Sequence, residues 1–533
     1  MAQFLDIFAF LSVLLRGTAL ALEALTLGGI LYFLVIARPL ADEVVLGRLQ
    51  RWIRYAAVFL ACTYAVVVAV NTAILINSTD LKLGDVVGAG FWIAGILVVA
   101  GASMIAIFAR SRWLPIVSPI AFVSIVAGSV MASHSVARLE HRWLLIISTL
   151  VHHVAGAAWI GGLPYLLVSL RRTSNLKAAS AMTARFSKLA IASVSLLLAA
   201  GLTLGFLYVG SIGALGETTY GVMLLSKVFL TAVLLLFGAL NLRVVRAVAA
   251  GAGPSMLPLR RFAEVEVGIG YTVLLAAASL TSTPPAIDVS VDRVSPQQIV
   301  QRMSPRWPRL DTPPLSALSP ASPLSIPQDS ALPGSFVPGQ LKQPNNPADI
   351  AWSEYNHHWA GLIVLAIGIL AVLSRRLSWA RHWPLMFFGL AIFLLVRSDS
   401  ENWPLGPRGF WESFQVAEVA QHRVFVLLIV AFGVFEWAVQ TGHLSPRRAG
   451  LVFPLVCAVG GALLMTHSHS LGNVKEEFLV ELSHIPLGIA AVIAGWMRWL
   501  EIRLPDKSLR LVSWIWPICF VVIGSVLICY RES

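Results

Sequence analysis

The sequence predicts an all-α protein, a polytopic integral membrane helix bundle with about 14 transmembrane helices. Of its 533 residues, 57% are hydrophobic and only 12% are charged, whereas about a quarter of the residues in a soluble domain are charged. Apolar stretches long enough to cross a bilayer, about 20 residues each, recur along almost the whole chain. Composition alone therefore excludes an ordinary soluble domain.

These apolar stretches give the expected order of the helices. The stretch 383–396 is the shortest, and it needs its apolar flanks to span a bilayer. No cleavable signal peptide is expected, because the first residues lack a basic region and run directly into a long apolar segment. The predicted transmembrane helices lie near 7–36, 53–77, 87–109, 114–132, 143–170, 189–211, 220–242, 262–282, 355–374, 383–396, 420–440, 449–466, 478–500 and 511–530.

Basic residues indicate the orientation, because Lys and Arg concentrate in cytoplasmic loops. They cluster in alternate loops, as at 171–188 and 498–510, and are sparse in the loops between them. Both termini are therefore predicted to face outward. The net charge of +12 follows from this topology, and it gives no reason to expect a nucleic-acid partner.

A proline-rich segment at 283–352 divides the chain. Such a composition disfavours helices and favours extended polyproline conformations. We therefore expect an eight-helix membrane domain at 1–282, a linker outside the membrane at 283–352 and a six-helix, histidine-rich membrane domain at 353–533. Three aromatic residues are candidates for pinning the linker onto the membrane domains: Trp307, Phe336 and Trp352.

Histidines gather at the predicted outer ends of the helices. The first cluster follows the fourth helix and enters the fifth, and imidazole and thioether groups together suit Cu(I), or Cu(II) where histidine alone supplies the ligands. Neighbouring helical residues point about 100° apart, so only one of His152 and His153 is expected to face a given partner. The alternative is that these residues cap, pack or lie in a loop. The cluster comprises Met131, His134, His141, His152 and His153.

A second, denser cluster occupies the outer ends of helices in the carboxyl-terminal half. Nearby glutamates such as Glu481 are candidates for orienting its imidazoles. Histidine in membrane helices is rare and usually functional. Two histidines at matched depth on neighbouring helices can instead ligate haem b, so copper and haem both stay open here. The candidate ligands are His357, His358, His422, Met465, His467, His469 and His484.

Charged residues inside the helices are costly unless they are paired or wet. Arg16 and Glu23 lie seven residues apart on one helix face, which predicts a mutual ion pair. Lys227, Glu264, Glu266 and Glu436 are expected to be paired as well, or to line a path for a cation or a proton. Small residues such as Gly161 and Gly461 are expected to let helices approach closely.

Several catalytic and nucleotide-binding motifs are absent from the sequence. It contains no Walker loop, no dinucleotide glycine fingerprint, no His-Glu-x-x-His and no Cys-x-x-Cys-His haem attachment. We therefore expect no enzyme and no ATP hydrolysis. Any transport would be passive, coupled to an ion gradient or driven by a partner.

The order of landmarks from Met131 to Pro285 resembles the membrane domain of the copper-resistance protein D family. The resemblance is carried by Ser133-His134, His152-His-Val-Ala-Gly-Ala-Ala-Trp-Ile-Gly-Gly-Leu163, Arg185-Phe-Ser-Lys-Leu-Ala190, Tyr220-Gly-Val-Met-Leu-Leu-Ser-Lys227, Gly238-Ala-Leu-Asn241 and Leu259-Arg-Arg-Phe-Ala-Glu-Val-Glu266. The proline-rich segment and the second histidine-rich half depart from simpler members, and no soluble copper-binding β-domain is attached.

This resemblance implies a multi-pass protein of the bacterial inner (cytoplasmic) membrane, with both termini in the periplasm. It implies copper resistance, with copper moved inward from the periplasm. His134 and His152 match histidine positions of the family, and Lys227, Asn241 and Glu266 match its recurrent polar positions. The resulting candidates for polar residues along a transport path are Arg16, Glu23, Lys227, Asn241, Glu264 and Glu266.

The leading hypothesis is a copper permease or loading protein that takes copper from the periplasmic face. Protonated imidazole does not bind metal, so binding should weaken below about pH 6. The expected partners are the lipid bilayer and either a periplasmic copper chaperone or other membrane subunits. The alternatives are a haem b-binding electron-transfer subunit and a scaffold subunit of a membrane complex.

Overall fold

The computed structural model describes residues 2–78, 81–173, 175–249, 256–289, 293–304, 306–318, 346–397, 399–400, 402–415, 417–445, 449–465, 474–504 and 510–532. Helices dominate these residues, and they contain no β-strand, only one isolated bridge between Asn402 and Arg408. His467, His469 and Phe336, which were singled out from the sequence, lie outside the described residues.

The predicted all-α membrane bundle is confirmed. Within the described ranges, 13 helices are long and apolar enough to cross a membrane, and they correspond to all but one of the predicted spans. The remaining prediction, at 449–466, is a shorter apolar helix, Ala449–Leu464. The weakest prediction, at 383–396, becomes a 20-residue span, Ser378–Arg397, because the residues before it add a 3₁₀ segment. These helices imply a lipid environment, and the direction in which the termini face stays a prediction.

The chain folds into two compact units. Unit 1 comprises Met1–Phe10, Gly216–Val222 and Val289–Ser533, and unit 2 comprises Leu11–Leu215 and Met223–Asp288. The division of the chain into domains at 1–282 and 353–533 with a linker between them stays a prediction.

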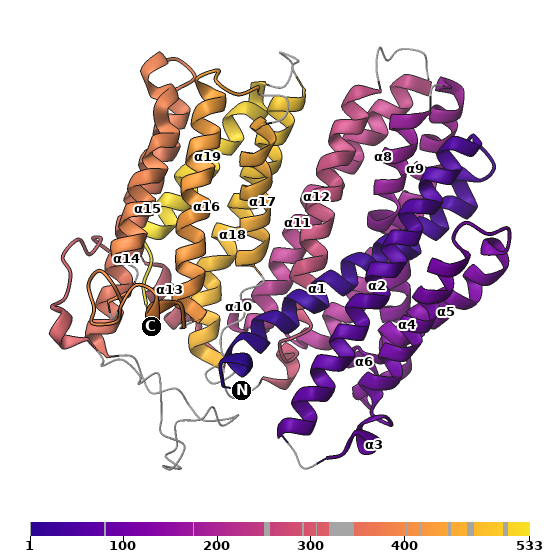
Figure 1. Ribbon diagram of the computed structural model, residues 1–533, viewed down its shortest axis with the longest axis horizontal. Coiled ribbons are helices and arrows are strands. Elements are labelled where there is room, and N and C mark those ends of the chain that lie inside the picture. Colours follow the sequence, from indigo (N-terminus) through magenta and orange to yellow (C-terminus); the bar gives the residue numbers. More distant parts are fainter. Residues whose placement is uncertain are drawn as a thin grey trace. The chain divides into compact units, whose positions relative to one another are not determined.

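Unit 2 is built mainly from the helices that appear indigo to magenta in Figure 1. Two π-helical segments, η1 and η2, interrupt its long helices, and such segments are frequent at functional sites. Its elements are α1 (Ala2–Tyr32), η1 (Phe33–Ala37), α2 (Glu43–Ser78), α3 (Leu83–Val86), α4 (Gly90–Phe108), α5 (Leu114–Met131), α6 (His134–Ala137), α7 (Arg142–Gly156), η2 (Ala157–Gly161), α8 (Leu163–Arg172), α9 (Leu176–Val209), α10 (Ala214–Glu217), α11 (Thr219–Ala249), α12 (Leu257–Leu280) and η3 (Ala286–Asp288), of which α1, α10 and α11 each place a few residues in unit 1.

The π-helical segment η2 lies in the packed centre of unit 2. It contacts α9 and α12, and its Gly161 lies directly against the backbone carbonyl of Ala24 on α1. A Cβ atom at Gly28 of α1 would likewise collide with the Ala157 carbonyl. No side chain fits at either glycine, so the predicted close approach of helices at small residues is confirmed here.

Unit 1 contains the orange and yellow helices of Figure 1. Neighbouring pairs include α14 with α19, α17 with α18, and α15 with α16. Its elements are α13 (Pro296–Met303), η4 (Leu315–Ala317), α14 (Pro347–Leu373), η5 (Ser378–Leu385), α15 (Met386–Arg397), η6 (Glu412–Gln415), α16 (Ala417–Gln440), η7 (Ala449–Leu451), α17 (Val452–Leu464), α18 (Val474–Arg503) and α19 (Arg510–Ile528).

A buried ion network joins three helices of unit 1, α16, α18 and α19, and the turn that follows α14. Arg498 of α18 pairs with Glu436 of α16 at 2.9 Å and with Glu501 at 2.7 Å. Glu501 also pairs with Arg375 and accepts a hydrogen bond from the indole of Trp516 on α19 at 2.7 Å. The expected pairing of Glu436 is therefore confirmed, and the opposite charges compensate one another away from water.

The part of the proline-rich segment near α13 is held by hydrogen bonds and not by Trp307, one of its three expected aromatic anchors. Trp307 is 96% exposed, so it does not pin the segment within the described residues. Instead, Arg531 donates to the carbonyls of Gln301 and Ser304. The last carbonyls of a helix lack intrahelical partners, and the guanidinium of Arg531 binds two of them at the carboxyl end of α13.

Adjacent glycines in α17 provide a test of close helix packing. A Cβ atom at Gly461 would come within 2.5 Å of the Gly488 carbonyl on α18, whereas one at Gly460 meets nothing within 4 Å. We expect Gly461→Ala to destabilise unit 1 by about 1–3 kcal/mol through overpacking, and Gly460→Ala to have little effect. Thermal unfolding in detergent measures both, and equal melting temperatures for the two variants would contradict this packing.

Candidate functional site

The adjacent histidines of α7 face different neighbours, as the sequence predicts. The Nδ1 atom of His153 lies 3.1 Å from Ser129 Oγ on α5 and 3.5 Å from Glu23 Oε1 on α1. His152 instead lies beside Gly201 on α9 and interacts electrostatically with Lys227 of α11. One helix thus presents an imidazole to each of two separate surroundings.

Glu23 is the deeply buried carboxylate of the first of these surroundings. It is 3% exposed, and its Oε2 atom is buried without a hydrogen-bond partner in the described structure. Tyr64 of α2 lies close enough to Glu23 and Ser129 to interact with both. Glu23, Ser129 and His153 therefore place a carboxylate and an imidazole together among membrane helices. We call these three residues the outer cluster, because this end of α7 is the one predicted from the sequence to face outward.

The predicted ion pair between Arg16 and Glu23 is wrong. Arg16 Nη1 donates to the carbonyl of Thr281 at 2.9 Å, while Glu23 faces His153. The last carbonyls of a helix have no intrahelical partner, and Thr281 caps the carboxyl end of α12. The long arginine side chain satisfies that carbonyl and leaves the carboxylate to the imidazole.

His134 binds the same carbonyl, with Nε2 at 2.8 Å from Thr281 O. A carbonyl accepts only, so Nε2 carries the proton and Nδ1 keeps its lone pair. His134 and Met131 are both exposed, at the adjoining ends of α5 and α6. His141 is exposed in a left-handed backbone conformation, with φ of 52°.

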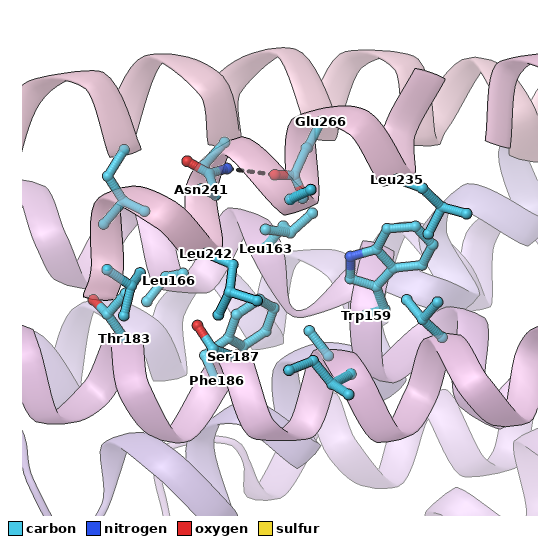
Figure 2. Close-up of a pocket in the computed structure, with 18 of the residues that line it drawn as sticks. Trp159, Leu163, Leu166, Thr183, Phe186, Ser187, Leu235, Asn241, Leu242 and Glu266 are labelled. Atoms are coloured by element: carbon cyan, nitrogen blue, oxygen red, sulfur yellow. Dashed lines mark hydrogen bonds between the residues drawn. The ribbon is translucent and has the colours of Figure 1, made fainter. Parts of the chain in front are cut away.

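A second polar pair lies in a pocket of unit 2. Asn241 Nδ2 of α11 donates to Glu266 Oε1 of α12, as Figure 2 shows. The pocket has a volume of about 230 Å³, and most of its lining is apolar, with Trp159 of η2 among the residues. The elements that form it are η2, α8, α9, α11 and α12.

Two further predicted path residues have different surroundings. Glu264 pairs with Arg171 at 2.5 Å and with Arg261 at 2.6 Å, so it is part of a fixed ion cluster at the arginine-rich end of α8. Lys227 is half-buried on α11, and no carboxylate pairs with it in the described part of the chain.

In unit 1, two of the predicted histidines meet near Tyr530. The rings of His357 and His484 lie 6.2 Å apart, edge to face, and Tyr530 stacks on His357 at 3.8 Å. His357 Nδ1 donates to the Ser353 carbonyl at 2.8 Å, which leaves the lone pair on Nε2. A backbone carbonyl commonly holds a metal-binding imidazole in this way.

His358 is a structural residue and does not fit the predicted role of a metal ligand. Its Nδ1 accepts from the Arg309 amide at 2.7 Å, and its Nε2 donates to the Tyr530 carbonyl at 2.8 Å. Both nitrogens are occupied, so the ring has no lone pair left for a metal. His358 joins the segment before η4 to the end of α19.

The remaining predicted ligands of unit 1 do not form one cluster with these rings in the described structure. His422 Nδ1 lies 3.2 Å from Asp399 Oδ1, and Met465 is 3% exposed and packed against Gly488. No group of three or more His, Cys, Asp or Glu is arranged to hold a metal ion among the described residues. Among the described residues, His357 and His484 are the predicted ligands that lie side by side, and the convergence of four helices on one site stays a prediction because His467 and His469 lie outside the described residues.

Residues 180–280 match the family model of copper resistance protein D. The resemblance predicted from the sequence is confirmed for this region. It contains Lys227, Asn241 and Glu266 and most of the pocket lining. The chain is therefore a multi-pass membrane protein with a copper-resistance-protein-D-like region.

One relative is the copper transport protein CutJ of Bacillus subtilis (strain 168), which is 28% identical over 211 residues. The match covers 38% of this chain and 38% of that protein. Both names refer to copper resistance or transport and not to catalysis. No solved structure gives a significant match.

Sequence reasoning missed several residues of these sites. Ser129 is one of many small polar residues in apolar helices, and nothing in its spacing marks it as a partner of His153. Tyr530, Ser353 and Glu532 are separated along the chain, yet Glu532 accepts from Ser353 Oγ at 2.6 Å and from Tyr530 at 2.7 Å. Only the packing of α14 against α19 brings them together.

Glu532 makes the stability of unit 1 depend on pH. Burial alone would raise its pKa, but the hydrogen bonds from Ser353 and Tyr530 and the nearby His357 outweigh burial and hold the pKa below its usual value of 4.5. Because the pKa is lower in the folded state, the carboxylate stabilises the fold above pH 4.5, and this contribution is lost as the pH falls through the folded pKa.

We therefore expect Glu532→Gln to lower the free energy of unfolding by about 1.5 kcal/mol at neutral pH. This difference in stability from the natural protein should shrink below about pH 4.5. Thermal unfolding across a pH series measures this difference. Asp311→Asn, at an exposed position, serves as the control and should change neither value. A difference for Glu532→Gln that does not vary with pH would contradict the assignment.

Proposed function

We propose that the chain is an inner-membrane copper-binding protein or permease. It takes copper from the periplasmic end of unit 2 and moves it into or across the membrane. The proposal rests on the outer cluster. In it, the Glu23 carboxylate is 3% exposed and has one oxygen without a hydrogen-bond partner, and it faces the His153 imidazole among transmembrane helices. An ionisable side chain inside a bilayer is expensive, and such residues commonly line an ion path.

Two steps of ligand exchange account for entry. His134 presents an unprotonated Nδ1 at the exposed end of α6, and Met131 adds a thioether at the adjoining end of α5. The outer cluster lies deeper, because His153 is 11 residues into α7, about 16 Å along the helix at 1.5 Å per residue. Imidazole, thioether and carboxylate together suit copper in either oxidation state.

The comparisons support copper as the cargo. The family model that matches residues 180–280 is named for copper resistance, and the matched relative is named as a copper transport protein. Unit 1 offers a second candidate position at His357, whose Nε2 keeps its lone pair and whose neighbour is His484. A periplasmic copper chaperone would deliver to these exposed ends. No contact among the described residues favours haem b or a scaffold role.

Metal content of the purified full chain tests the proposal. We expect His153→Ala and Glu23→Gln each to lose about one copper per chain after loading and desalting, because each removes a donor of the outer cluster. His443→Ala and Glu140→Gln are matched controls at exposed positions and should keep the full content. Unchanged copper in both test variants would overturn this site.

The same preparation distinguishes the haem alternative by its absorption spectrum. An intense Soret band that disappears in His357→Ala would mean that unit 1 binds haem and not copper.

Copper binding should also weaken below about pH 6, because protonated imidazole is not a ligand. Copper content that stays constant from pH 7 to about pH 5 would argue against histidine ligation.

A further inference from the structure

The pocket of unit 2 contains one titratable side chain. Glu266 is 3% exposed and Asn241 is 9% exposed, and no lysine, arginine or histidine is among the residues that line the pocket. Asn241 Nδ2 donates to Glu266 Oε1, while Asn241 Oδ1 is buried without a hydrogen-bond partner in the described structure. The pair therefore has an acceptor that lacks a donor.

No cationic side chain pairs with Glu266 in the described structure. Glu264, two residues earlier on α12, is paired with Arg171 of α8 and Arg261. The hydrogen-bond donors of Glu266 are neutral groups, the amide of Asn241 and the indole of Trp159 on η2. A carboxylate in this place would be an isolated charge, which is among the most costly groups to bury.

We infer that Glu266 binds a proton, and that Glu266 and Asn241 form the site of a coupling proton separate from the metal site. A protonated carboxyl donates its O–H to Asn241 Oδ1 while Asn241 Nδ2 donates to the other carboxyl oxygen. This two-bond pairing satisfies both polar atoms of the amide at once. Only the protonated form supplies the donor that Asn241 Oδ1 lacks.

The donor set of the pocket suits a proton better than copper. Its lone-pair donors are oxygens of a carboxylate, an amide and the hydroxyls of α9 such as Ser187, and its nitrogens, on Trp159 and Asn241, are N–H groups (Figure 2). Copper prefers imidazole and sulfur ligands, and the outer cluster holds the imidazole. The inference rests on the proposed function, because it names the ion that accompanies the copper.

The step moves one proton and no electrons. Glu266 releases H⁺ to water in the pocket and becomes a carboxylate, which still accepts from Asn241 Nδ2, and it regains H⁺ from the other side of the membrane. Release leaves a buried negative charge and an orphan amide oxygen. It is therefore favoured only when a positive charge comes near, and this requirement would couple the proton to a passing cation.

Infrared difference spectra of the full chain in lipid, taken between acidic and alkaline buffers, test the protonation directly. We expect Glu266→Gln to remove one protonated-carboxyl band. Glutamine can pair with Asn241 through two amide hydrogen bonds, so this variant should fold. Its copper content should equal that of the natural protein. Glu140→Gln, at an exposed position, should keep the band.

A double variant that exchanges the carboxyl group and the amide group provides the second test. In Asn241→Asp with Glu266→Gln, the carboxyl and the amide trade places, and we expect the band to return and the pH dependence of copper uptake into proteoliposomes to recover in part. Glu266→Gln alone should take up copper at a rate that no longer responds to a pH gradient. A band that survives in Glu266→Gln, or a loss of bound copper in that variant, would overturn the inference.

The two proposals fail in different ways. If His153→Ala loses copper while Glu266→Gln keeps its carboxyl band, the copper function stands and the proton site is wrong. If no variant alters bound copper but the band disappears in Glu266→Gln, the proton site stands and the copper proposal fails.

Discussion

The bilayer supplies no water to its interior, so every polar group inside it needs a partner from the protein. This constraint accounts for most polar contacts of the chain. Glu436 is neutralised by Arg498, Glu264 by two arginines, and the final carbonyl of α12 is shared by Arg16 and His134. Against this background, the groups left without a partner are informative.

Two of these groups, both in unit 2, carry the proposals, and their chemistry differs. Glu23 offers a carboxylate oxygen without a hydrogen-bond partner next to an imidazole, a combination that we propose as the metal site. Asn241 offers a spare amide oxygen next to a carboxyl group, a combination that a proton completes. The continuous run of α7, η2 and α8 connects them, because it carries His153 to the outer cluster and Trp159 to the pocket wall. Separate sites allow the metal and the proton to be bound without competing for one ligand.

Histidine identity alone does not decide function in this fold. His357 and His358 are adjacent on α14, but His357 keeps the lone pair of Nε2 while both nitrogens of His358 are bound. Their roles differ because α14 turns the His357 ring toward the side chains of Tyr530 and His484 and the His358 ring toward the backbones of Arg309 and Tyr530. A metal ligand needs a free lone pair, and the surrounding hydrogen bonds decide which ring has one.

The sequence by itself determined the membrane class, nearly all the spans and the copper-resistance-protein-D-like region. The length and hydropathy of a helix are local properties. The landmarks in residues 180–280 are likewise short motifs whose order can be read directly from the sequence. Tertiary structure decided the partners. Glu23 lies against His153 and not against Arg16, and Arg531, not Trp307, holds the segment near α13. Ser129 and Glu532 lie in the candidate sites only because distant helices pack together. Helical periodicity states which residues share a face, but the neighbour that the face meets depends on contacts between segments distant in sequence. Those contacts are set by packing of the whole unit, which no local pattern encodes.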